Sequence, residues 1–126
     1  MVKTALVNLD IVKGAEMLRI LDAAKLKLSV AMWVVFSEYE DWRLLVASRQ
    51  LDTPNVKDSY LTFFRTLDAG GFKADTPTTI LLPMTDPTIK DLRRRYVKWK
   101  VVEGTNVNLQ SFGDRWVEDS YVYRIT

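Results

Sequence analysis

The chain has 126 residues, of which 48% are hydrophobic and 27% are charged, and its formal net charge is +2. This composition is typical of a globular protein, and the length fits one domain, residues 1–126, with one real core. The sequence has no cysteine and no histidine. Their absence excludes disulfides, thiolate and imidazole metal sites, and Ser-His-Asp or Cys-His catalysis. The small net charge does not by itself indicate a nucleic-acid partner.

The sequence shows no sign of a membrane or export segment. No apolar run approaches the roughly 20 residues that are needed to cross a bilayer. The N-terminal apolar stretch is short and is interrupted by Asn8 and Asp10, so it lacks the apolar region of a signal peptide. We therefore expect a cytoplasmic protein that makes no contact with a membrane.

Apolar residues at helical spacing predict a first helix from about Asp10 to Lys25. Its stripe includes Met17, Leu21 and Ala24, and Asp10 is the expected N-cap. Gly14 weakens this helix by up to about 1 kcal/mol unless another group packs closely against it.

Two strands are predicted after this helix. Residues 28–36 are β-branched, aromatic and apolar on both faces, which is typical of a central strand covered on both sides. Residues 42–48 predict the second strand. Because only the polar residues 37–41 separate the two, we expect an antiparallel hairpin.

The strongest helical pattern in the chain follows. Thr53 is the expected cap and Pro54 the expected first helical residue, and the pair Gly70-Gly71 is expected to end the helix. Apolar side chains recur at i, i+4, i+7, i+8 and i+11 along this segment, at Val56, Tyr60, Phe63, Phe64 and Leu67.

A third strand and a third helix are predicted next. Residues 78–82 predict a buried strand, and its connection to the second strand through a helix predicts a parallel crossover. Asp86 and Pro87 predict the cap and first residue of a helix. The apolar side of this helix contains Ile89, Leu92 and Tyr96.

Two strands, residues 106–112 and 116–125, are predicted to end the chain, with a type II′ turn at Gly113-Asp114. Alternation in the last strand predicts one apolar face and one face that is wet or lies against a polar partner. The first face holds Val117, Tyr121, Tyr123 and Ile125, and the second holds Glu118, Ser120 and Arg124. Together the elements predict an α+β fold: a mixed, mostly antiparallel sheet of about five strands with three helices packed on it.

A basic segment, residues 90–100, is the most pointed candidate site. Cations supply most non-specific affinity for nucleic acids, and aromatic rings can stack on bases. The structural alternative is that cations near a helix C-terminus complement its dipole. The candidate polyanion-binding residues are Lys90, Arg93, Arg94, Arg95, Lys98, Trp99 and Lys100.

An acidic turn at Glu38 to Asp41 is a second candidate, because neighbouring carboxylates can hold Mg²⁺ or act in acid–base catalysis. Glu118 and Asp119 also lie near a strand end and are candidates for the same polar site. The strand at 42–48 lacks the acidic-x-Lys pattern of a restriction-type nuclease, and acidic turns are usually only solvated. The sequence predicts no cofactor.

The tryptophans are a third feature. Trp33 lies within an apolar strand and is expected in the core, whereas Trp42 and Trp116 lie at strand starts, where a ring face can be exposed. Exposed aromatic side chains are enriched at interfaces, so they indicate an oligomer, with ordinary edge packing as the alternative.

A family resemblance rests on three parts of the sequence: residues 31–48 (AMWVVFSEYEDWRLLVAS), Leu9-Asp10-Ile11 with Lys13-Gly14, and residues 117–124. In these segments the chain resembles short, uncharacterised bacterial reading frames. The resemblance implies a bacterial, intracellular setting and no particular activity.

These observations favour a non-catalytic binding or interaction protein that self-associates through an exposed sheet edge or an aromatic surface. One alternative is a module that binds nucleic acid or another polyanion through the basic segment. The other is a metal-dependent hydrolase or nuclease that uses carboxylates near residues 38–41.

Overall fold

A computed structural model describes residues 6, 8–39, 41–96 and 104–126 of the chain. Within these residues, three α-helices pack on one five-stranded sheet with the strand order β3-β2-β1-β5-β4. The predicted α+β fold with a mixed, mostly antiparallel sheet is confirmed. The elements are α1 (Asn8–Ala23), β1 (Val30–Phe36), β2 (Arg43–Ala47), a short 3₁₀ helix η1 (Arg49–Leu51), α2 (Val56–Ala69), β3 (Thr79–Leu81), α3 (Pro87–Tyr96), β4 (Gln110–Phe112) and β5 (Arg115–Ile125).

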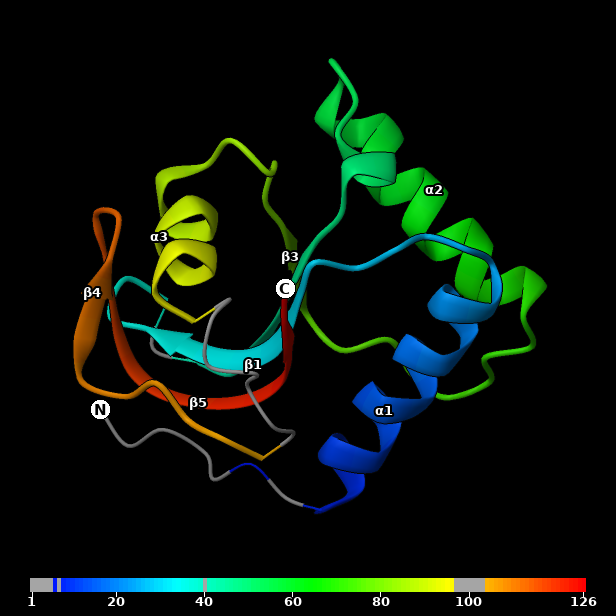
Figure 1. Ribbon diagram of the computed structural model, residues 1–126. Coiled ribbons are helices and arrows are strands. Elements are labelled where there is room, and N and C mark those ends of the chain that lie inside the picture. The colour runs from blue at the N-terminus through cyan, green and yellow to red at the C-terminus, as the bar shows by residue number, and fades with distance from the viewer. Residues whose placement is uncertain (1–5, 7, 40, 97–103) are drawn as a thin grey trace.

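Helices cover both faces of the sheet. Figure 1 shows α3 (yellow) on one side and α1 (blue) with α2 (green) on the other. Two core clusters correspond to these two sides: α1 and α2 pack against Trp33 and Leu44, and α3 packs against Met32 and Val34. All seven residues of β1 are buried, which confirms the prediction of a central strand covered on both faces.

The strand pairing agrees with the predicted connections. β1 pairs antiparallel with β2, as expected for a hairpin with a short polar connection. β2 pairs in parallel with β3 after the chain passes through α2, which confirms the parallel crossover. Within the described residues, no helix is both long enough and apolar enough to span a bilayer.

Helix α1 packs against the sheet through a glycine. A Cβ atom on Gly14 would lie 2.4 Å from the Tyr123 hydroxyl oxygen and 3.0 Å from Trp33 Nε1. Trp33 Nε1 donates to that hydroxyl at 3.0 Å, and the hydroxyl donates to the Ile11 carbonyl at 2.5 Å. Another group therefore packs closely against Gly14, which is the condition under which a glycine was expected not to weaken the helix at this position. Ala24, which was expected on the buried stripe of the helix, is exposed.

The prediction for the start of the second helix is wrong by two residues. Asn55, not Thr53, is the N-cap, because its side-chain oxygen accepts from the Lys57 amide at 2.9 Å. Pro54 therefore lies before the helix. The Thr53 hydroxyl is used otherwise, since it donates to the Asn55 carbonyl at 2.6 Å and lies 2.8 Å from the Ser59 hydroxyl.

Helix α3 begins as predicted. Asp86 Oδ1 accepts from the Thr88 amide at 2.8 Å, and Pro87 is the first helical residue. Arg115 Nη1 also donates to Asp86 Oδ1 at 2.8 Å, so the cap is tied to β5. Ile89 is buried on the side that faces the sheet, as expected.

The predicted alternation in the last strand is wrong. Val117, Val122 and Ile125 belong to the core on the α3 side, whereas Tyr121 and Tyr123 lie on the side of α1 and α2. The register against β1 shifts between Ala31 and Met32 and again between Val35 and Phe36. Such irregularities break the period of two. Both faces of β5 contribute to a core cluster, so neither is the predicted wet face.

The strand before the Gly113-Asp114 turn is shorter than predicted, because it begins at Gln110 rather than near residue 106. Leu109 has a φ of 57°, which interrupts extended backbone. The Val107 amide donates to the Ser120 hydroxyl at 2.8 Å instead of to a neighbouring strand. Gly113 has a φ of 61°, and Asp114 is not in the positive-φ region, as a type II′ turn requires.

Candidate functional site

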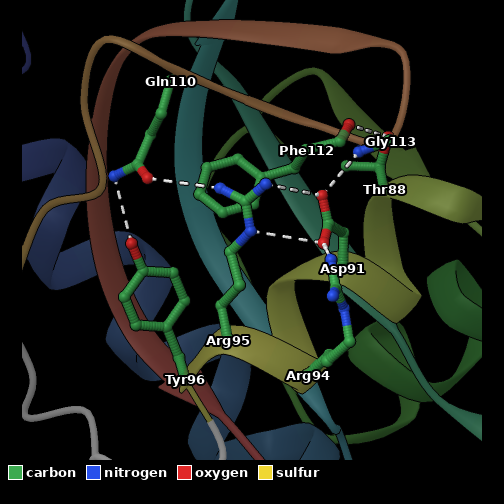
Figure 2. Close-up of polar contacts among 8 residues, drawn as sticks. All are labelled: Thr88, Asp91, Arg94, Arg95, Tyr96, Gln110, Phe112 and Gly113. Carbon is green, nitrogen blue, oxygen red and sulfur yellow. Dashed lines mark hydrogen bonds and ion pairs between the residues drawn. The ribbon is translucent and has the colours of Figure 1, made fainter.

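The described part of the basic segment joins α3 to the β4–β5 hairpin. Figure 2 shows Asp91 between two arginines of its own helix: it pairs with Arg94, and Arg95 Nη2 lies 3.2 Å from its Oδ2. Asp91 Oδ2 also accepts from the Gly113 amide at 3.0 Å. The Arg95 guanidinium carbon lies 4.9 Å from the centroid of the Phe112 ring. Two of the predicted polyanion-binding cations, Arg94 and Arg95, are therefore paired with Asp91 of the same chain, while their side chains remain exposed.

The same network continues to the start of β4. Arg95 Nη1 donates to Gln110 Oε1 at 3.4 Å, and Gln110 Nε2 donates to the Tyr96 hydroxyl at 3.0 Å. Tyr96 packs against the core on the α3 side. This contact agrees with the prediction that Tyr96 lies on the apolar side of the third helix.

Asp91 is an acidic group with a perturbed pKa. The hydrogen bond from Arg94 is the largest cause that lowers the pKa of the carboxyl, with help from the Gly113 amide and from Arg95. Burial acts in the opposite direction. Asp91 therefore stays ionised and offsets part of the positive charge of its helix.

The remaining basic candidates are dispersed or lie outside the described residues. Arg93 Nε donates to the backbone oxygen of Thr126 at 2.8 Å, and Lys90 is exposed on α3. Lys98, Trp99 and Lys100 lie outside the described residues.

The carboxylates proposed for a polar site do not form a group of three that could hold a metal ion in the described part of the chain. Glu38 lies 3.3 Å from Arg115 Nε, and Asp119 Oδ1 accepts from the Asn108 side chain at 3.2 Å. Asp41 and Glu118 are exposed. Across residues 6, 8–39, 41–96 and 104–126, no three acidic side chains are grouped closely enough to hold a metal ion.

Two hollows on the described surface also lack converging catalytic groups. One, of about 500 Å³, lies between the C-terminal ends of α1 and α2, and its lining is mostly small or apolar, with Arg19 and Arg65 at its sides. The other, of about 80 Å³, contains Asp52, Thr53 and Ser59. The Asp52 carboxylate accepts from the Met84 amide at 3.0 Å, so its charge supports a turn of the backbone.

The tryptophans lie largely where the sequence indicated. Trp33 is buried in the core, Trp42 packs partly buried against the same cluster, and Trp116 is 42% exposed. Trp116 is at the start of β5, as the prediction of a partly exposed ring required.

The outer side of α2 carries apolar side chains that the described residues cover only in part. Phe63 and Leu67 are buried, but Leu61 is 37% exposed and Phe64 is 40% exposed. The Phe64 ring lies between two neighbours: its centroid is 5.3 Å from that of Phe63 and 6.3 Å from that of Tyr60. These contacts hold the exposed aromatic ring in place.

Four residues form a regular line on this side of α2, which we term the α2 stripe: Lys57, Leu61, Phe64 and Asp68. The spacings are four, three and four residues, so the line has the same spacing in both directions. Its two ends carry opposite charges, and both charged residues are exposed. The sequence interpretation assigned Phe64 to the apolar pattern and overlooked Lys57, Leu61 and Asp68. The symmetric spacing is a signal that could have revealed them.

The edges of the sheet are less suited to binding another strand. The edge strands β3 and β4 have three residues each, and short edge strands are poor templates for strand addition. The Leu81 amide in β3 donates to the Tyr60 hydroxyl at 3.1 Å, so a side chain already occupies one of its donors.

The α2 stripe is therefore the surface of the described residues that most resembles a contact site, because it combines exposed apolar groups, a fixed aromatic ring and unpaired terminal charges. Comparison with known proteins adds no assignment: the chain matches no protein-family model, no curated protein and no solved structure.

Proposed function

We propose that this protein is a non-catalytic interaction module that self-associates through the α2 stripe. The observation that carries the proposal is the exposure of Leu61 and Phe64, at 37% and 40%, on a helix whose opposite side is buried. Exposed apolar groups with a rigid aromatic anchor are typical of protein contact sites. The expected bacterial, cytoplasmic setting belongs to the same proposal and rests on the sequence alone.

The charges of the stripe favour a second copy of the chain as its occupant. Lys57 and Asp68 stand at opposite ends of the stripe, so one copy offers both the cation and the anion that the other copy needs. A partner that carries the same stripe is therefore complementary in both apolar character and charge.

The polar groups of the described residues support a non-catalytic role. The carboxylates of Asp52, Asp86 and Asp91 each accept a hydrogen bond from a backbone amide. They serve turns, caps and the docking of a hairpin. Asp91 also offsets Arg94 and Arg95, which weakens the case for a polyanion site on the described part of α3.

The proposal is tested by the mass of the protein in solution as a function of concentration. We expect sedimentation equilibrium to show a mass that rises from that of one chain toward that of two. Phe64→Ser should weaken this association by about tenfold or more, because it removes the aromatic anchor.

Leu109→Ser is the matched control. Leu109 is more exposed than Phe64, at 70%, but it directly precedes β4, where its amide donates to the Val117 carbonyl, and it is not on α2. It should leave the association unchanged. A wild-type protein that remains a single chain at high micromolar concentration would contradict the proposal, and so would a loss of association in Leu109→Ser alone.

A further inference from the structure

The geometry of the α2 stripe points to a specific arrangement of the two copies, and this inference rests on the proposed function. We infer that α2 of one copy packs antiparallel against α2 of a second copy around a two-fold axis. In this arrangement Lys57 of each copy faces Asp68 of the other, and Leu61 of each faces Phe64 of the other.

The stripe is narrow and straight enough to form one seam. At 3.6 residues per turn, its four side chains project within an arc of about 60° on the helix. The rise of about 1.5 Å per residue places Lys57 and Asp68 about 16 Å apart along the axis. Over this length the stripe has two apolar residues in the middle and one charged residue at each end.

The spacing of the stripe is what allows a two-fold axis. A two-fold interface brings the same surface of both copies together, so the surface must be complementary to its own reverse. The spacings of four, three and four residues place the midpoint of the stripe between positions 62 and 63. Reversal about this point exchanges Leu61 with Phe64 and Lys57 with Asp68.

Charge selects the antiparallel orientation over the parallel one. In an antiparallel pair, both ends of the seam join a lysine to an aspartate. In a parallel pair, Lys57 would face Lys57 and Asp68 would face Asp68, which is repulsive at both ends. Neither side chain makes an ion pair with any other residue that the structure describes, so both are available to a second copy.

The apolar centre and the charged ends have different tasks. Exposed ion pairs contribute little free energy each, so we expect Leu61 and Phe64 to supply most of the affinity. Charges at the rim of an interface mainly control orientation and partner choice. The inferred dimer is therefore held by its apolar centre and aligned by its two ends.

Disulfide trapping tests the arrangement directly, because the natural chain has no cysteine. Lys57→Cys and Asp68→Cys are prepared separately and are oxidised alone and as an equimolar mixture. We expect the mixture to form a disulfide-linked dimer joining position 57 to position 68, at least tenfold faster than either variant alone. Asp58→Cys, exposed on another side of α2, is the control and should not accelerate linkage when mixed with Asp68→Cys.

Charge reversal supplies a second measurement that needs no covalent bond. Lys57→Glu and Asp68→Lys should each weaken self-association by roughly tenfold, because each places like charges at both ends of the seam. An equimolar mixture of the two variants should associate with near wild-type affinity, since the mixed pair has opposite charges at both ends.

The outcomes separate this inference from the proposed function. If the wild-type chain associates and Phe64→Ser weakens this association by about tenfold or more, but the cysteine variants link 57 to 57 and 68 to 68, the antiparallel arrangement is overturned and the proposed function stands. Equal linkage in the Asp58→Cys control would also overturn the arrangement. A wild-type chain that never associates would overturn both.

Discussion

Gly14 shows how one residue can determine where a helix lies. In most exposed helix positions, replacing glycine by alanine stabilises a protein by up to about 1 kcal/mol. Here a Cβ atom would lie 2.4 Å from the Tyr123 hydroxyl, which itself bonds the Ile11 carbonyl and accepts from Trp33. The absence of a side chain at position 14 thus lets α1 approach β5 and β1.

We therefore expect Gly14→Ala to destabilise the protein by about 1–3 kcal/mol, because the helix must shift or the hydrogen bonds must break. Urea denaturation measures the change in the free energy of unfolding. In the Tyr123→Phe background the cost of Gly14→Ala should be smaller, since the hydroxyl that the new Cβ would strike is gone. Equal costs in both backgrounds would show that the close contact is not the cause.

Asp91 is the residue at which acid should weaken the fold. The pKa of its carboxyl is lower in the folded state, chiefly because of the hydrogen bond from Arg94. A carboxyl with a lowered folded-state pKa stabilises the protein above its unfolded pKa of about 4, and this stabilisation is lost as the pH falls through the folded value. The pKa of Asp22, lowered by its hydrogen bond with Arg124, adds stability of the same sign over the same range.

Asp91→Asn should lower the free energy of unfolding by about 1–2 kcal/mol at pH 7, because charge-assisted hydrogen bonds are lost. The difference from the wild type should shrink as the pH is lowered below about 4. Chemical denaturation at pH 7 and pH 3 measures both values. Asp114→Asn is the control, since that side chain is 87% exposed, and a larger deficit at pH 3 than at pH 7 would contradict the prediction.

At the level of elements, the start of α3 combines a local signal with a long-range one. Asp86 caps the helix through the Thr88 amide, as its position before Pro87 predicted. The same carboxylate pairs with Arg115, whose Nη1 also donates to the Thr88 hydroxyl at 2.8 Å. The cap is thus also a link between α3 and β5, which the local sequence could not reveal.

Because of this second role, Asp86→Ala should cost about 2 kcal/mol or more, whereas Asn55→Ala should cost about 1 kcal/mol or less. Asn55 is the matched control: it caps α2 through the Lys57 amide, and its side chain is exposed. Thermal or urea denaturation of the two variants gives the comparison. Equal losses would mean that Arg115 adds nothing to the cap.

Two errors, in the buried side of α2 and in the faces of β5, have a related cause. The apolar pattern from Val56 to Leu67 predicted a helix, and α2 is that helix, yet Val56 and Phe64 remain exposed. Periodicity shows which residues share a side of a helix, but the neighbours decide which part of that side is covered. In β5, the shifts of register against β1 likewise placed residues that were predicted on one face of the strand on two different faces of the sheet.

For the whole molecule, the sheet order places the most apolar strand in the middle. β1 has β2 on one side and β5 on the other, with helices over both faces. Strands of this kind exchange their amide hydrogens only when most of the structure opens. β3, by contrast, is a three-residue edge strand.

We expect hydrogen exchange followed by mass spectrometry to show that the amides of β1 are the slowest in the described part of the chain. Those of β3 should exchange at least tenfold faster, because an edge can open without disrupting the centre. Peptides from α1 should lie between the two. Equal protection in β1 and β3 would mean that the sheet opens only as one unit.

The sequence by itself determined the class of the fold, the type of each described α-helix and strand, and the helix start at Asp86-Pro87, but not the short 3₁₀ helix η1. These features depend on hydrophobic period, cap chemistry and short connections, all of which are local. It also indicated that Trp33 is in the core and that part of the Trp116 ring is exposed.

Only the tertiary structure decided which apolar residues remained uncovered and which polar side chains of α3 reach the β4–β5 hairpin. Asp91 and Arg95 contact the β4–β5 hairpin, and α2 leaves Leu61 and Phe64 at the surface. The pairs of Asp91 with Arg94 and Arg95 are local, at i,i+3 and i,i+4 within one helix, but the bonds from the Gly113 amide to Asp91 and from Arg95 to Gln110 join segments that are far apart along the chain. The exposure of Leu61 and Phe64 likewise depends on which other segments pack against α2. A linear pattern cannot specify such long-range contacts, because burial and the docking of one element on another are properties of neighbours in space.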